Sequence, residues 1–322
     1  MPTPRAQLVS LADTPWYHVV SRCVRRAFLC GVDAYSGQDY EHRRPWVEKR
    51  VAAVARVFAI DVAAYAIMSN HYHLVLHVDV DRAAAWSMDD VIERWHALFN
   101  GTRLSQRYQH ARSTLTDGEV AHVRTCAEVW RARLADISWF MRCVNEPIAR
   151  QANAEDRCTG LFWEGRFKSQ ALLDDAAVLA AMAYADLNPI RANLAETPET
   201  SEHTSIKRRI EQAKSGNIPS GLMRFQGDAH RDKHEGIPFA LAHYVELVDL
   251  TGRVVRGGKR GAMDDTLPPI LERLGIDADT WLSISTTFET SFQNWVGTEA
   301  AIQRATRNVG KTRSRSPPLF AA

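Results

Sequence analysis

Residues 68–77 read Met-Ser-Asn-His-Tyr-His-Leu-Val-Leu-His, and this stretch says most about the fold. Its valine and leucine residues favour extended backbone, in which successive side chains point to opposite faces. A strand here has an apolar face and a histidine-bearing face, made of Tyr72, Leu74, Leu76 and Val78 and of His71, His73, Val75 and His77. Residues two apart on a strand lie roughly 6–7 Å apart at Cα. The two imidazoles can therefore hold one divalent cation; the alternative is a structural or solvent-facing pair.

The composition is that of an ordinary globular protein. The chain has 322 residues, of which 45% are hydrophobic and 24% charged, and its net charge is +2. Such a balance permits a nucleic-acid partner without requiring one. After Glu299 the chain has no acidic residue, while five basic residues follow. This basic tail is interpreted either as a phosphate-binding segment or as a solubilising extension.

Cysteine usage and hydropathy favour an intracellular protein. The five cysteines include no Cys-x-x-Cys pair, which argues against a disulfide framework and against a structural zinc site. The first seven residues have no apolar signal core, and no stretch approaches the roughly 20 apolar residues of a membrane span. We therefore expect a soluble protein in the cytoplasm.

Hydrophobic periodicity predicts alternating strands and helices in residues 1–195. Extended segments are expected at 16–29, 62–78 and 161–173, and helices at 45–59, 88–100, 134–148 and 176–186. Asp174 is the expected cap of the last of these helices. Residues 101–118 look like a loop or an insertion, and the polar insertion is expected to cover about 101–125. This order predicts an α/β (α+β) fold, with a mainly antiparallel sheet flanked by helices. Residues 196–322 are expected to form a linker and a basic, partly helical C-terminal extension.

Four segments of residues 1–195 resemble the single-tyrosine HUH transposases, especially the REP-associated branch. The order and spacing of the four segments match that family, which makes the resemblance far more specific than any one motif. The segments are Tyr17-His18-Val19-Val20-Ser21-Arg22, Met68-Ser69-Asn70-His71-Tyr72-His73-Leu74, Gly160-Leu161-Phe162-Trp163-Glu164-Gly165-Arg166-Phe167-Lys168 and Tyr184-Ala185-Asp186-Leu187-Asn188-Pro189-Ile190-Arg191-Ala192.

The resemblance implies a ferredoxin-like HUH core and a homodimer that acts on single-stranded DNA, often beside a hairpin. It further implies that His71 and His73, with one polar side chain, hold Mg²⁺ or Mn²⁺. In the family a helix-borne tyrosine then attacks the scissile phosphate and forms a 5′-phosphotyrosine link. Bound cations neutralise charge on a phosphodiester, and a covalent ester conserves the bond for rejoining.

One departure from the family concerns the nucleophile. The matching helix, residues 140–153, contains no tyrosine, and Pro147 or Ile148 stands at the expected place. A proline in mid-helix also removes a backbone hydrogen bond. Gln151, one turn after Pro147, is the candidate third metal ligand, and Asn153 competes with it, since amide oxygens coordinate hard cations. Both are otherwise ordinary solvated side chains.

No other tyrosine replaces the missing nucleophile convincingly. Tyr184 is a candidate because it lies in a family-like segment. It is a weak one, because a tyrosine at this position is more often a packing residue. Tyr108 lies in a possible loop without a supporting motif, and Tyr72 points away from the histidines. The catalytic residue is therefore left unassigned.

Basic and aromatic residues supply candidate DNA contacts. Arg166 and Lys168 are two apart on an expected strand, and Arg22 and Arg25 end another, beside Arg26. Guanidinium and ammonium groups at such positions bind phosphates. Phe162 and Trp163 are candidates for stacking on bases, with core packing as the alternative for Trp163.

Three functions follow from these patterns. The first is a transposase-like protein of the cytoplasm, associated with the nucleoid, that binds single-stranded or hairpin DNA and cleaves and transfers strands with a divalent metal. The second is a catalytically inactive DNA-binding relative, because the tyrosine is missing. The third is an unrelated metal-dependent hydrolase that uses the histidines with a carboxylate such as Asp186.

Overall fold

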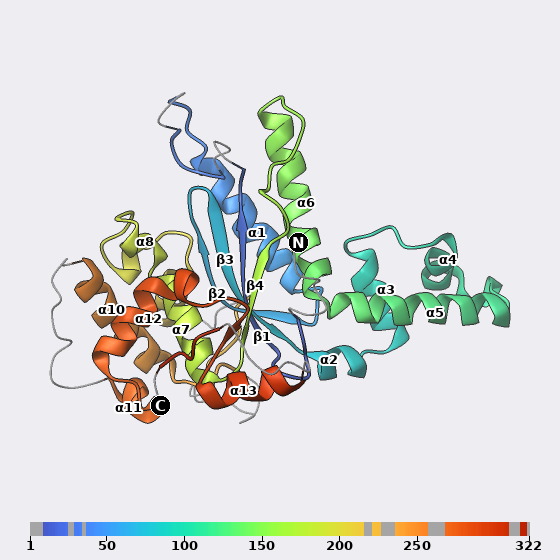
Figure 1. The fold of residues 1–322 in the computed structure, drawn as a ribbon. Helices are drawn as coiled ribbons and strands as arrows, with labels where there is room; N and C mark the ends of the chain where they lie inside the picture. The colour runs from blue at the N-terminus through green and yellow to red at the C-terminus, as the bar shows by residue number, and fades with distance from the viewer. Residues whose placement is uncertain are drawn as a thin grey trace. The chain divides into compact units, whose positions relative to one another are not determined.

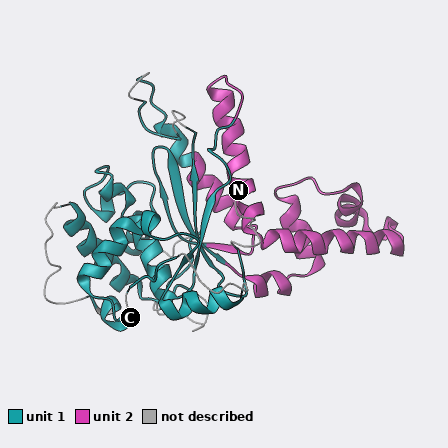
Figure 2. Cartoon of the chain, in the orientation of Figure 1, with its two compact units in different colours: residues 1–45, 62–77, 161–322 teal, residues 46–61, 78–160 magenta. Residues whose placement is uncertain are grey.

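A computed structural model of the chain describes residues 9–24, 29–33, 37–215, 221–226, 236–256, 268–308 and 316–320. The chain forms two compact units, coloured separately in Figure 2. Unit 1 comprises residues 1–45, 62–77 and 161–322, and unit 2 comprises residues 46–61 and 78–160. Residues 196–322, expected as a separate extension, thus group with the sheet in unit 1.

The centre of unit 1 is a mostly antiparallel sheet, as the sequence predicts, and the sheet has five strands (Figure 1). The strand order is β2-β3-β1-β4-β5, and β5 is parallel to β4. Strand β1 pairs antiparallel with both β3 and β4. The strands are β1 (Trp16–Arg22), β2 (Ile60–Ile67), β3 (His71–Val78), β4 (Lys168–Leu172) and β5 (Trp295–Val296). The mixed α/β fold class is therefore confirmed.

Helices of unit 1 pack against this sheet and build its core. Asp174 begins α7, as predicted, because its carboxylate accepts a hydrogen bond from the backbone N–H of Ala177 at 2.9 Å. Helix α12 packs against α7 (Figure 1), and the buried Trp281 and Phe288 of α12 enter the same hydrophobic cluster as α7. The helices are α7 (Asp175–Asp186), α8 (Asn188–Arg191), α9 (Ser205–Lys214), α10 (Leu241–Arg256), α11 (Pro269–Leu274), α12 (Ala278–Ser291) and α13 (Glu299–Asn308).

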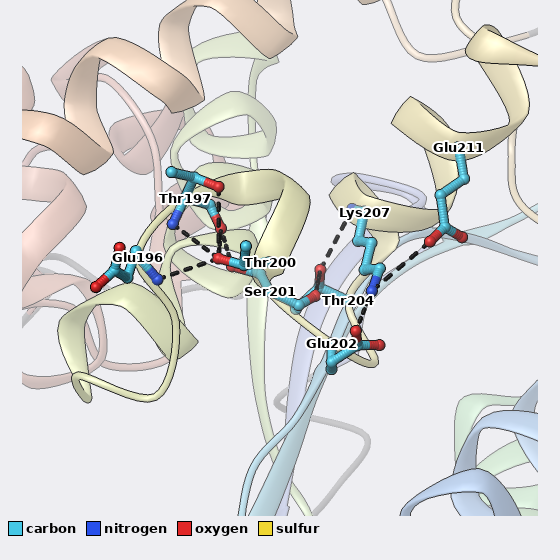
Figure 3. A network of polar contacts seen from close by, with 8 residues as sticks. All are labelled: Glu196, Thr197, Thr200, Ser201, Glu202, Thr204, Lys207 and Glu211. Atoms are coloured by element: carbon cyan, nitrogen blue, oxygen red, sulfur yellow. Dashed lines mark hydrogen bonds and ion pairs between the residues drawn. The ribbon is translucent and has the colours of Figure 1, made fainter.

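Residues 196–211 are ordered by a network of local polar contacts, shown in Figure 3. The hydroxyl of Ser201 donates to the carbonyl of Thr197 at 2.9 Å, and Thr204 donates to that of Ser201 at 2.7 Å. Thr204 also caps α9, and Lys207 pairs with Glu202 and with Glu211. Residues 196–211 of the expected linker therefore form a folded connection, which includes a 3-10 turn at Pro198–Thr200.

This connection covers the free edge of β2. The N–H of Ile67 donates to the carbonyl of His203 at 3.2 Å, and the N–H of Tyr65 donates to the hydroxyl of Ser205 at 2.9 Å. The buried Arg209 donates to the carbonyl of Ala63 at 2.8 Å. Unpaired strand edges invite association with other chains, so residues 203–209 satisfy and shield this one.

Unit 2 is helical. The expected loop at 101–118 is wrong, because α4 begins at a capping box formed by Thr102 and Ser105, and α5 begins at one formed by Thr116 and Glu119. Trp95 and Trp130 stack at 5.3 Å between ring centroids and join α3 to α5. The helices are α1 (Arg44–Ala55), α2 (Val80–Ala85), α3 (Met88–His96), α4 (Arg103–Ala111), α5 (Asp117–Leu134) and α6 (Ile137–Glu155), with 3-10 turns at Arg112–Thr114 and, in unit 1, Glu41–Arg43.

Candidate metal and DNA-binding site

One face of the sheet collects polar side chains from three adjacent strands. In an antiparallel pair, residues directly opposite each other point to the same face. Arg22 of β1 lies opposite His71 of β3, and Val20 lies opposite His73. Across the other edge of β1, His18 pairs with Gln170 and Val20 with Lys168 of β4. The register therefore places three histidines, one amide and two cations on the same face of the sheet.

His71 and His73 share a face, as the alternation predicts, and their ring centroids lie 4.8 Å apart. The Nδ1 atom of His71 lies 2.7 Å from the side-chain oxygen of Asn70, which can only accept. His71 therefore carries its proton on Nδ1, and its Nε2 has a free lone pair. His73 is fully buried, and within the described residues its Nε2 has no hydrogen-bond partner.

A buried imidazole nitrogen without a partner is costly unless a ligand supplies the missing bond. Metal-binding histidines typically present one nitrogen to the ion and donate from the other to a neighbouring acceptor. Both His71 and His73 fit this arrangement, because Nδ1 of His71 faces Asn70 and Nδ1 of His73 lies 3.0 Å from Nε2 of His18. Among the described residues, however, no three His, Cys, Asp or Glu side chains are grouped so that they can hold a metal ion. Amide, water and substrate oxygens are the candidates for the remaining ligands.

Burial keeps these imidazoles neutral. Desolvation, reinforced by the charge of Arg22, lowers the pKa of His71 to about 4. Desolvation, with His18 and His71 adding to it, holds the pKa of His73 well below its ordinary value. Neutral imidazole is the form that binds metal, so neither ring needs to lose a proton at pH 7 before it coordinates a cation.

Tyr184 and Phe288 cover the buried side of the histidines. The Tyr184 ring lies edge-on to His73, with 5.6 Å between centroids, and Phe288 lies edge-on to His18 at 5.5 Å. The guanidinium of Arg191 stacks on the Tyr184 ring at 3.8 Å, and Asn188 accepts a hydrogen bond from Arg191 at 3.0 Å. The family-like segment at 184–192 thus places a cation and a tyrosine at the histidines.

Glu289 of α12 adds a carboxylate that the sequence did not indicate. Its Oε1 lies 3.6 Å from Nη2 of Arg22 and 3.8 Å from Nζ of Lys168. Its Oε2 accepts a hydrogen bond from the Tyr184 hydroxyl at 3.5 Å. Two of the four cations expected to bind phosphates, Arg22 and Lys168, therefore share one protein carboxylate.

The structure places the other predicted DNA contacts in different settings. Lys168 and Arg166 do not share a strand, because β4 begins at Lys168; Arg166 precedes it and is exposed. Arg25 and Arg26 lie outside the described residues. Phe162 and Trp163 are buried, and Trp163 packs edge-on to Tyr72 at 5.7 Å. Core packing, the alternative stated for Trp163, is therefore confirmed.

Helix α6 of unit 2 carries the residues expected at the nucleophile and third-ligand positions. It runs through Pro147 from Ile137 to Glu155, and Gln151 on it is exposed. Asn153 is engaged with the chain beyond the helix, because its amide donates to the carbonyl of Gly160 at 3.1 Å. The coordination of a metal by Gln151 stays a prediction.

The remaining candidates, Tyr108, Tyr72 and Asp186, are all buried. Tyr108 lies in helix α4, not in a loop, and is buried under the guanidinium of Arg112 at 4.4 Å. Tyr72 is fully buried on the face opposite the histidines, as expected. Asp186 is also fully buried, and both its oxygens accept hydrogen bonds, from Ser205 and Tyr244 among others. This carboxylate is therefore a buried hydrogen-bond acceptor in unit 1.

Known proteins give limited guidance. No protein-family model matches the chain, and neither does any sequence among the curated proteins. One similar solved structure is that of a REP-associated tyrosine transposase bound to a REP hairpin. Its sequence is 12% identical to this chain, and the TM-score is 0.36. The match covers 70% of this chain and 92% of that chain. A likeness of this degree carries no functional argument. None of the described helices has the length and apolar character needed to cross a membrane.

Proposed function

We propose that this chain binds single-stranded or hairpin DNA on the histidine face of its sheet and cleaves it with the help of a divalent cation. The observation that carries the proposal is that Nε2 of the buried His73 has no hydrogen-bond partner among the described residues, beside the ring of His71. Arg22 and Lys168 on the same face offer phosphate contacts.

His71 and His73 would hold Mg²⁺ or Mn²⁺, and the two nitrogen donors favour Mn²⁺ of this pair, because Mg²⁺ prefers oxygen ligands. Gln151 is the proposed third ligand. When bound, the cation neutralises negative charge on the scissile phosphate. Arg22 and Lys168 supply further positive charge and fix the position of the DNA backbone.

Tyr184 is the candidate nucleophile of this chain, because its ring contacts His73 and no tyrosine is present on α6. Attack of its oxygen on phosphorus would form a 5′-phosphotyrosine bond and release the 3′-oxygen, which takes a proton to become a hydroxyl. Burial raises the pKa of Tyr184, however, which makes the phenolate harder to form. This second observation favours the alternative function, a DNA-binding relative of transposases without cleavage. A homodimer and a nucleoid-associated location belong to the proposal in either case.

The test is a denaturing gel of the full-length protein with labelled hairpin oligonucleotides and Mn²⁺. Active cleavage yields a shortened product and a slowly migrating protein–DNA band, both absent in His73→Ala. Loss of the slow band in Tyr184→Phe identifies the nucleophile, and peptide mapping finds any other one. Hairpin binding without cleavage supports the inactive alternative. Cleavage with no covalent band indicates a hydrolase, and absence of both binding and cleavage refutes the proposal.

Replacing Glu289 by Gln is expected to tighten hairpin binding by about 3- to 10-fold at low salt. The substitution frees Arg22 and Lys168 from a competing carboxylate and removes a charge that repels phosphate. Fluorescence anisotropy at several salt concentrations measures this, and the gain should shrink as salt rises. Glu196→Gln is the matched control, because it removes the same charge beside Arg256, which is not a proposed DNA contact. An unchanged or weaker affinity of Glu289→Gln would show that these cations do not contact the DNA.

A further inference from the structure

Gln170 is held in one orientation by the end of helix α12. Its side-chain nitrogen donates to the backbone carbonyl of Phe292 at 2.6 Å, and both groups are buried. A carbonyl only accepts, so the amide nitrogen must face Phe292 and the amide oxygen must face the other way. That oxygen lies 2.7 Å from Nδ1 of His18. His18 therefore carries a proton on Nδ1 and donates it to Gln170.

The orientation of Gln170 determines the tautomer of two histidines in turn. His18 is fully buried, where a doubly protonated ring is costly, so its Nε2 is unprotonated and accepts. This Nε2 lies 3.0 Å from Nδ1 of His73, and the two rings are nearly parallel, at 2°. His73 must then donate from Nδ1, which leaves its Nε2 as a free lone pair. That is the nitrogen that lacks a partner among the described residues.

We propose that His18 and Gln170 form a relay that locks His73 as the Nδ1-protonated tautomer and so prepares its Nε2 to bind a metal ion. Both are positioning residues, and neither touches the metal. The inference rests on the proposed function, because the metal site is part of it. Hydrogen bonds to a metal-binding histidine fix its ring and tautomer, and their loss typically costs about 10- to 100-fold in metal affinity.

The relay also connects residues 196–322 to the histidine site, because one of its hydrogen bonds ends on that region. Its last acceptor, the carbonyl of Phe292, follows α12, and Ala171 of β4 donates to the carbonyl of Asn294 at 2.8 Å. The Phe288 ring packs edge-on to His18 and closes the relay from water. The C-terminal region therefore fixes a histidine tautomer on a strand at the centre of the sheet.

The test compares His18→Leu with His18→Gln in the full-length protein. Leu removes the acceptor for His73, whereas the Gln amide oxygen can stand where the His18 Nε2 stood. Long-range ¹H–¹⁵N spectra of ¹⁵N-histidine protein without metal report which His73 nitrogen is protonated, and calorimetry measures Mn²⁺ and Co²⁺ affinity. Wild type and His18→Gln should show the Nδ1-protonated form. His18→Leu should show mixed tautomers and roughly 10- to 100-fold weaker metal binding.

Gln170→Met tests the relay at the residue that contacts His18 and not His73. It serves as a second variant in case His18→Leu does not fold. It should shift the tautomer in the same direction and weaken metal binding by a smaller factor. A proton on Nε2 of His73 in the wild type overturns the relay, and so do variants whose tautomer and affinity are unchanged. If the wild type binds neither metal, the proposed metal site fails, while the tautomer measurement still decides whether the relay exists.

Discussion

A chain that ends at Ala195 is expected to lose the cooperative unfolding transition of unit 1. Four side chains beyond that point, Tyr244, Leu247, Trp281 and Phe288, are fully buried in the core of unit 1. Burial of such side chains contributes roughly 1.5–3 kcal/mol each, so these four alone approach the 5–15 kcal/mol of a typical domain. The shortened chain would also expose the edges of β2 and β4, because residues 203–209 and β5 cover them.

Urea unfolding followed by circular dichroism measures this effect. Leu247→Ala in the full chain is the control, since it should lower the free energy of unfolding by about 2–5 kcal/mol and still unfold cooperatively. A transition of the 1–195 chain at the wild-type urea midpoint would mean that the C-terminal region is dispensable for folding. If the shortened chain is unfolded, its failure to bind a hairpin says nothing about DNA recognition by residues 196–322. Local substitutions such as Glu289→Gln then address that question.

The sequence predicts the histidine face because the signal is local. His71 and His73 alternate with apolar residues on one strand, and period-2 alternation needs no knowledge of the neighbouring strands. The start of α7 is likewise predicted, since Asp174 is a helix cap recognisable from its own position. Such features depend on residues a few positions apart, and the structure confirms them.

The relay and the carboxylate could not be predicted, because they depend on strand register and on distant parts of the chain. Gln170 meets His18 only because β4 pairs with β1 in one register, and a shift by one residue would turn it to the other face. Glu289 reaches Arg22 through the packing of α12 on α7. Helix α4 was missed because most of its residues are polar and the capping box of Thr102 and Ser105 at its start was not recognised in the sequence.

The buried carboxyl group of Asp186 is expected to make the free energy of unfolding depend strongly on pH. Ser205 donates to its Oδ1 at 2.6 Å, the N–H of Ile206 donates to the same atom at 2.9 Å, and Tyr244 donates to Oδ2 at 2.6 Å. Complete burial nevertheless raises the pKa of this carboxyl to about 6, although these donors and the charge of Arg209 act in the opposite direction. The folded state therefore binds the Asp186 proton more tightly than the unfolded chain does.

Linkage fixes the sign of the effect. The protonated carboxyl stabilises the fold below pH 4, and this contribution is lost as the pH rises through 6, by at most about 3 kcal/mol for a shift of some two pKa units. Asp186→Asn stays neutral, so its free energy of unfolding should rise relative to wild type between pH 4 and 7. The buried histidines have lowered pKa values and impose the opposite trend in both proteins, so urea unfolding must be compared as a difference at each pH. A difference that does not change with pH would mean that Asp186 titrates near its ordinary value, and that the three donors fully compensate for its burial.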